Sequence, residues 1–204
     1  MGYLALSANC GNDNVAIGKA SLQIATGGGN VAVGKDSGLI VTSGELNTYV
    51  GTLSGKDATT GTRNTALGNY SGASDQNSSG GSGDDNVWIG HQAGMKSSSA
   101  SDNVALGSFA GDAITTGTEN VFVGTLAGSA LIDASSNVGV GRAALNADTK
   151  GTRSTALGNN ALATQNFTTA TNTHNTAVGY NAGLSVTTGK NNTLVGAKAG
   201  DALT

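Results

Sequence analysis

A five-residue phrase recurs through the chain and constrains the fold more than any other feature. It first reads Asn-Val-Ala-Ile-Gly at residues 14–18, and seven of the ten spacings between consecutive copies are 17 residues. The ten later copies begin at Asn30, Asn47, Asn64, Asn86, Asn103, Asn120, Asn137, Ser154, Asn175 and Asn192. A fixed short period is typical of a solenoid, in which one supersecondary unit stacks on the next. We therefore expect a single repeat array over residues 1–204, with about eleven coils.

Each phrase has the pattern of a short β-strand. Its second and fourth residues are Val or Thr and then Ile, Val or Leu, as in Val15 and Ile17. Alternation with a period of two places such a pair on one strand face, which we assign to the inside of a narrow roll. The closing glycine ends the strand where a side chain would obstruct a tight corner. These features predict an all-β fold, a parallel β-roll or β-solenoid.

The composition narrows the possible partners. Aromatic residues make up 4% of the chain and charged residues 11%, with 33 glycines and no proline, so a conventional core is excluded. Ordering an isolated coil costs more conformational entropy than its few aliphatic residues offset, which predicts burial against other chains. A net charge of −3 without a basic patch argues against nucleic acid as a partner. Membrane contact is not expected either, because no apolar run of about 18 residues is present.

Two further features of the repeats indicate where the chain is closely packed and where it forms surface loops. Three residues after each closing glycine lies Ser or Ala, from Ser21 to Ala199, which indicates a second, closely packed wall of the coil. Two coils are longer than the rest, and solenoid insertions become surface loops. They are either tolerated insertions or contact loops, with Ser78, Ser79, Phe167 and Thr168 as candidate contact residues.

The third residue of the phrase is never charged, and never Ser or Thr, in eleven copies. Because it points away from the face assigned to the roll interior, we interpret it as an apolar stripe covered by identical chains. The candidate trimer-interface residues are Ala16, Ala32, Tyr49, Ala66, Trp88, Ala105, Phe122, Ala156, Ala177 and Leu194. The alternative is a ligand-stacking surface made by Tyr49, Trp88 and Phe122.

The phrase resembles the Asn-Ser-Val-Ala-Ile-Gly head repeat of YadA-like trimeric autotransporter adhesins. Residues 175–183, Asn-Thr-Ala-Val-Gly-Tyr-Asn-Ala-Gly, resemble repeats of phage tail fibres and other bacterial trimeric adhesive fibres. This resemblance implies a homotrimer of left-handed parallel β-rolls, with Val and Ile inside each roll and the intervening Ala toward neighbouring chains. It also implies an extracellular, cell-surface or virion location. The family's Ser position is mostly Asn here, with Ser154 as the exception.

No catalytic, cofactor or metal site is expected. His91 and His174 have no recurring acidic or cysteine partner, and Cys10 is interpreted as a small, at least partly buried hydrophobic residue. Acidic residues such as Asp85 alternate with Arg63 and Arg153 before the phrase, which indicates a solvated edge.

The function expected from the sequence is structural and adhesive. The chain would be a segment of a trimeric fibre that supports attachment to a glycan or protein receptor on a cell surface, through repeated weak contacts. One rival is an enzyme of the hexapeptide acyltransferase type, although the six-residue rhythm of that fold is missing between the phrases. The other is a monomeric solenoid that binds ice or carbohydrate. An ice-binding solenoid needs a flat, regular array of Thr, whereas Thr at the second position of the phrase alternates irregularly with Val and is expected to face inward.

Overall fold

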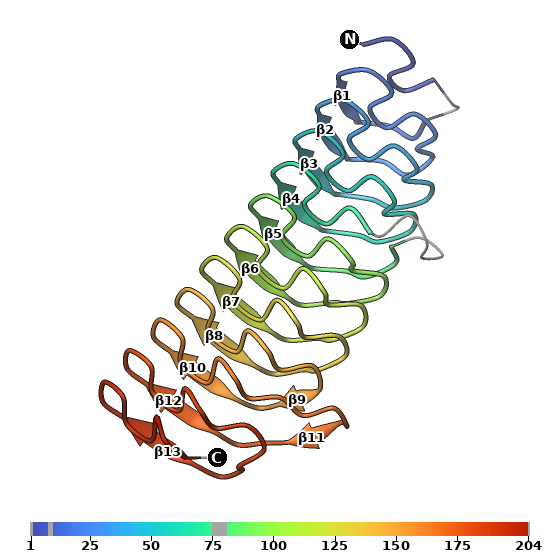
Figure 1. The fold of residues 1–204 in the computed structure, drawn as a ribbon. Coiled ribbons are helices and arrows are strands. Elements are labelled where there is room, and N and C mark those ends of the chain that lie inside the picture. Colours follow the sequence, from blue (N-terminus) through green and yellow to red (C-terminus); the bar gives the residue numbers. More distant parts are fainter. Residues whose placement is uncertain (1, 8–9, 75–80, 204) are drawn as a thin grey trace.

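The chain is a single stack of β-coils (Figure 1). The computed structural model describes residues 2–7, 10–74 and 81–203, and these residues contain strands, turns and bends but no helix. The strands are β1 (Val15–Ile17), β2 (Val31–Val33), β3 (Thr48–Val50), β4 (Thr65–Leu67), β5 (Val87–Ile89), β6 (Val104–Leu106), β7 (Val121–Val123), β8 (Val138–Val140), β9 (Gly151–Thr152), β10 (Thr155–Leu157), β11 (Thr171–Asn172), β12 (Thr176–Val178) and β13 (Thr193–Val195).

Eleven of these strands form one parallel sheet, each contributed by one coil. Their order is β1-β2-β3-β4-β5-β6-β7-β8-β10-β12-β13, so every strand pairs with those of the preceding and following coils. The register aligns equivalent residues, and Ala66 of β4 pairs with Trp88 of β5 despite the longer connection between them. Strands β9 and β11 form a separate parallel pair between the coil that holds the second long connection and the coil before it. The predicted all-β parallel β-solenoid is confirmed.

Glycine at the end of each main strand permits the coils to stack closely. At Gly18 the φ angle is 133°, and a β-carbon added there would lie 2.3 Å from the carbonyl oxygen of Gly34 in the next coil. A β-carbon added at Gly90 would likewise lie 2.5 Å from the carbonyl oxygen of Gly107, which is one coil further on. Any side chain at this corner would therefore push neighbouring coils apart, which is the role that the sequence predicted for these glycines.

The structure reverses the predicted inside and outside of the strands. In every main strand the middle residue has the lowest exposure, while the residues on either side of it are exposed or half-exposed. The interior therefore holds the residues that were assigned to the trimer interface: Ala16, Ala32, Tyr49, Ala66, Trp88, Ala105, Phe122, Ala156 and Ala177 are buried, and Leu194 in the last coil is half-buried. The interface assignment was wrong because these side chains are already covered within one chain.

The physical reason is the narrow cross-section of the roll. The middle strand residue faces a second position, four residues after the closing glycine, which we call the wall site. In six coils the two positions compensate in size: Tyr49 lies with Gly55, Trp88 with Gly94 and Phe122 with Gly128, whereas Ala16 lies with Leu22, Gly139 with Leu145 and Ala156 with Leu162. In four other coils the strand residue is alanine and the wall residue is glycine, so both positions are small. A β-carbon added at Gly94 would lie 2.2 Å from the Trp88 ring. An aromatic side chain on the strand thus requires glycine opposite.

The small residue that precedes the wall site is buried, as predicted. From Ser21 to Ala182 this row has almost no exposed surface. In the first coils its hydroxyls donate to strand carbonyls of the following coil, with Ser37 Oγ 3.0 Å from the Tyr49 carbonyl oxygen. The row therefore forms the second wall of the roll, where a larger side chain would meet the adjacent strand.

The leading asparagines form a buried ladder along the stack. Asn120 illustrates it: its Nδ2 donates to the carbonyl oxygen of Ala134 and to Oδ1 of Asn103, both at 2.9 Å. Its own Oδ1 accepts from the backbone N–H of Asn137 at 3.0 Å and from Asn137 Nδ2 at 3.1 Å. The Asn120 amide thereby joins its strand start to the next coil and to the turn of its own coil, which leaves no polar group of this amide unpaired.

The ladder changes chemistry at Ser154, the one copy without asparagine. Gln165 fills the gap: its Nε2 donates to Ser154 Oγ at 2.8 Å and to the carboxylate of Asp148, and its Oε1 accepts from Asn175 Nδ2 at 2.8 Å. Asp148 also accepts the backbone N–H groups of Gly151 and Phe167, both at 3.0 Å. A substitution at one ladder position is therefore compensated by two polar side chains that replace apolar ones in the core.

Candidate functional site

The outward side of the main sheet is a continuous surface that no other described part of the chain covers. It consists of the second and fourth residues of every phrase, which we call the outer face. Its first row is Val15, Val31, Thr48, Thr65, Val87, Val104, Val121, Val138, Thr155, Thr176 and Thr193. Its second row is Ile17, Val33, Val50, Leu67, Ile89, Leu106, Val123, Val140, Leu157, Val178 and Val195. None of these side chains is buried in the single chain.

The outer face is uncharged. The second row is aliphatic throughout, the first row holds six valines and five threonines, and no member is charged or aromatic. Eleven rungs at about 4.8 Å give a band about 50 Å long, and three residues at about 3.3 Å give a width of about 10 Å. The footprint is about 500 Å², at the upper end of the apolar patches found on monomeric proteins, which are often functional. This surface is suited to pack against another apolar surface.

Sequence reasoning placed the outer-face residues in the core. The alternation correctly showed that Val15 and Ile17 share a face, but it does not say which face is inside. The signal that could have decided this was in the sequence: aromatic residues at Tyr49, Trp88 and Phe122 always coincide with glycine six residues later. Such size compensation is a property of positions that meet inside a packed core.

The edges of the outer face carry the polar and charged residues. Arg63 forms an exposed two-point ion pair with Asp85, with Nε to Oδ1 at 2.6 Å and Nη2 to Oδ2 at 2.7 Å. The hydrogen bonds from Arg63 lower the pKa of the Asp85 carboxyl. Ser136 Oγ donates to Glu119 Oε2 at 2.9 Å. These contacts connect neighbouring coils at the surface and contribute little to stability because both partners are solvated.

The remaining candidate residues do not form a chemical centre. His91 and His174 are exposed, and the His91 ring meets the Phe109 ring edge-on with centroids 5.3 Å apart. Among the described residues, no group of three or more His, Cys, Asp or Glu side chains is placed to hold a metal ion. Cys10 is exposed, so its assignment as an at least partly buried hydrophobic residue was wrong.

The two long connections contain the four candidate contact residues. Ser78 and Ser79, in the first connection, lie outside the described residues. Phe167 is buried and its backbone N–H donates to Asp148, so it is a core residue rather than a contact residue. Thr168, next in the chain, is exposed.

A shallow groove crosses one edge near the N-terminal coils. It has a volume of about 410 Å³, and its walls include Asp13, Glu45 and Leu46. Gly28 and Gly29 lie between these walls and provide no side chain to fill the space. The groove is therefore a local consequence of the Gly27–Gly29 run rather than a feature repeated along the array.

The fold defines the class of protein as a parallel β-solenoid with one uncovered aliphatic sheet face. No family model, curated protein or solved structure matches the chain. No helix in the described part of the chain has the length and apolar character needed to cross a membrane.

Proposed function

We propose that this chain is a structural and adhesive segment of a homotrimeric fibre, on a cell surface or a virion, that supports attachment to a receptor. The observation that carries the proposal is the outer face, which is aliphatic and hydroxyl-bearing along the entire stack. Removing such a surface from water stabilises association and desolvates no charge.

The occupant of the outer face is a second and a third copy of the same chain. Copies arranged around an axis parallel to the stack place coils of equal height side by side, so the first row of one chain meets the second row of its neighbour. Three copies rather than two follow from the resemblance to YadA-like head repeats. The proposed interface therefore consists of the residues on either side of the middle strand residue, and not of the middle residue itself as predicted from the sequence.

The adhesive role follows from repetition. Three identical chains present every surface site three times, and weak contacts to a glycan or protein receptor gain avidity when they bind together. The polar edges and turns are the surfaces left for a receptor once the outer face is covered.

The mass of the chain in solution tests the assembly. We expect light scattering to give three times the 19.8 kDa of one chain. Val121→Lys should dissociate the trimer into folded monomers, because Val121 is already exposed in one chain and becomes buried only between chains. A lysine buried there without a partner is strongly unfavourable.

The control is Ile132→Lys, which changes an equally exposed aliphatic residue outside the outer face. It should leave the mass unchanged. A monomeric wild-type chain, or a Val121→Lys variant that retains its mass, would contradict the proposal.

The second candidate function is a monomeric solenoid that binds ice. One observation favours it: the threonines of the first row, including Thr155 and Thr176, point outward in line rather than inward as the sequence reasoning assumed. If the chain is a monomer, thermal hysteresis of its solution measures this activity. A monomer without hysteresis would remove this candidate as well.

A further inference from the structure

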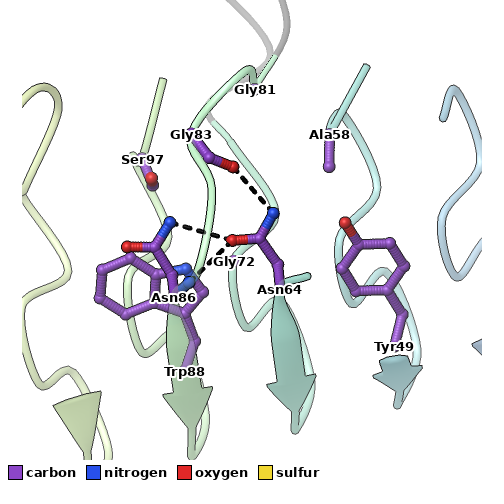
Figure 2. Close-up of a pocket in the computed structure, with 9 residues that line it drawn as sticks. All are labelled: Tyr49, Ala58, Asn64, Gly72, Gly81, Gly83, Asn86, Trp88 and Ser97. Carbon is purple, nitrogen blue, oxygen red and sulfur yellow. Dashed lines mark hydrogen bonds between the residues drawn. The ribbon is translucent and has the colours of Figure 1, made fainter. Parts of the chain in front are cut away.

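A small cavity lies inside the roll between the coils of β3 and β5 (Figure 2). Its volume is about 20 Å³, and its lining includes the side chains of Tyr49, Asn64 and Trp88 together with Gly83 and Ala58. It is separate from the outer face, because Tyr49 and Trp88 are interior residues.

The cavity follows from the core packing described above. The coil of β4 lies between the two aromatic coils, and its strand residue Ala66 and wall residue Gly72 are both small. Three residues after the wall site, the coil of β3 has Ala58, where the coil of β7 has Leu131. Ala58 therefore leaves space beside the Tyr49 ring, whereas Leu131 fills the corresponding space beside Phe122. The equivalent residue of the β4 coil, 75, lies outside the described residues.

The Tyr49 hydroxyl is the unusual group at this cavity. Tyr49 has 1% of its surface exposed, and its Oη has no hydrogen-bond partner. Burial raises the pKa of this hydroxyl, so it remains protonated and requires an acceptor. Figure 2 shows the hydroxyl pointing from β3 toward Ala58, at the level of the Asn64 amide.

Packing does not require the hydroxyl. Phe122 occupies the equivalent strand position of β7, and Gly128 lies opposite its ring as Gly55 lies opposite the Tyr49 ring. A buried hydroxyl without a partner is unfavourable, so its presence here implies a hydrogen-bonding ligand.

We propose that this cavity is an internal hydration site that holds one water molecule, bound by Tyr49 Oη and by the carbonyl oxygen of Gly83. The volume accommodates one water and excludes a second, since a water needs at least about 10 to 15 Å³ of such space. The Gly83 carbonyl oxygen accepts Asn64 Nδ2 at 2.8 Å and has a second lone pair. The Asn64 amide has no further capacity, because both its Oδ1 and its Nδ2 take part in two bonds each.

Replacing Tyr49 by Phe tests the site with water itself as the probe. Oxygen-17 relaxation dispersion of the solvent counts the water molecules whose residence time inside a protein exceeds the rotational correlation time of that protein. We expect Tyr49→Phe to hold one such water fewer than the wild type, in the same oligomeric state. The folding equilibrium constant should stay the same or fall, because the variant loses a satisfied hydrogen bond.

The matched control is Phe122→Tyr, which adds a hydroxyl at the equivalent position where Leu131 leaves no space. It should gain no internal water and should lower the folding equilibrium constant at least about fivefold, the effect of an unpaired buried hydroxyl. An unchanged water count in Tyr49→Phe would overturn the proposal. A rise of about fivefold or more in its folding equilibrium constant would do the same, by showing that the wild-type hydroxyl is unpaired.

Discussion

Three wall-site glycines, Gly55, Gly94 and Gly128, act at the scale of single residues, because each makes room for the ring opposite it. The backbone at this site has positive φ whichever residue occupies it: Leu22, Leu145 and Leu162 have φ angles of 46°, 53° and 50°. Leucine is therefore tolerated there by the backbone, at the cost of a left-handed conformation. What excludes leucine at Gly94 is the Trp88 ring, which lies opposite.

This pairing predicts a non-additive double substitution. Gly94→Leu should destabilise the protein by about 3 kcal/mol because of overpacking, and Trp88→Ala by about 3 to 5 kcal/mol because of the cavity that it leaves. The double variant reproduces the Ala156 and Leu162 pair of another coil and should recover at least about 2 kcal/mol relative to the sum. Chemical denaturation of the four proteins measures the coupling, and strict additivity would refute the shared-volume account.

At the scale of the element, the asparagine ladder holds successive strand starts in register. A rung inside the stack, such as Asn120, has partners in the coils before and after it. The side-chain amide of Asn192, in the last coil, is bonded only to Asn175 Oδ1. The two positions therefore differ in how many buried groups depend on the amide.

Asn120→Ala should accordingly cost about 2 to 4 kcal/mol of unfolding free energy, since it leaves the buried Asn137 N–H and the Ala134 carbonyl without their partner. Asn192→Ala removes no bond from a following coil and should cost less than about 1 kcal/mol. Thermal or chemical unfolding compares the two. Equal losses would mean that the amides stabilise their own turns rather than the stacking of coils.

The strands and their stacking could be predicted from the sequence, whereas the inside of the strands could not. The phrase at Asn14 and its ten copies determined the strands, their parallel stacking and the corner glycines, because a repeated local pattern has one stacked solution. The inside of the strand could not be read from alternation, since Val15 and Ala16 are both compatible with either face. The role of the asparagines was missed because hydrogen bonds between coils leave no trace in the spacing of apolar residues.

At the scale of the whole molecule, the outer face is not uniform along the stack. Strands β5 to β8 are aliphatic in both rows, as are β1 and β2 at the N-terminal end, while β3 and β4 between them and β10, β12 and β13 beyond them carry threonine in the first row. The longest wholly aliphatic run, β5 to β8, therefore lies near the middle of the stack, and the most apolar and most central part of a protein interface contributes most of the binding energy. If identical chains cover this face, we expect β5 to β8 to dominate their association.

Exchanging valine and threonine tests this distribution with side chains of nearly the same shape. Val104→Thr with Val121→Thr buries two hydroxyls at the centre and should raise the concentration at half-dissociation at least about tenfold, from about 1 kcal/mol for each site. Thr155→Val with Thr176→Val should lower it. Because all four side chains are outside the roll, the stability of the dissociated chain should change little in either variant. Analytical ultracentrifugation over a dilution series measures both shifts. If the two pairs change association equally, the energy is spread evenly along the stack; if neither pair changes it, the outer face is not the interface.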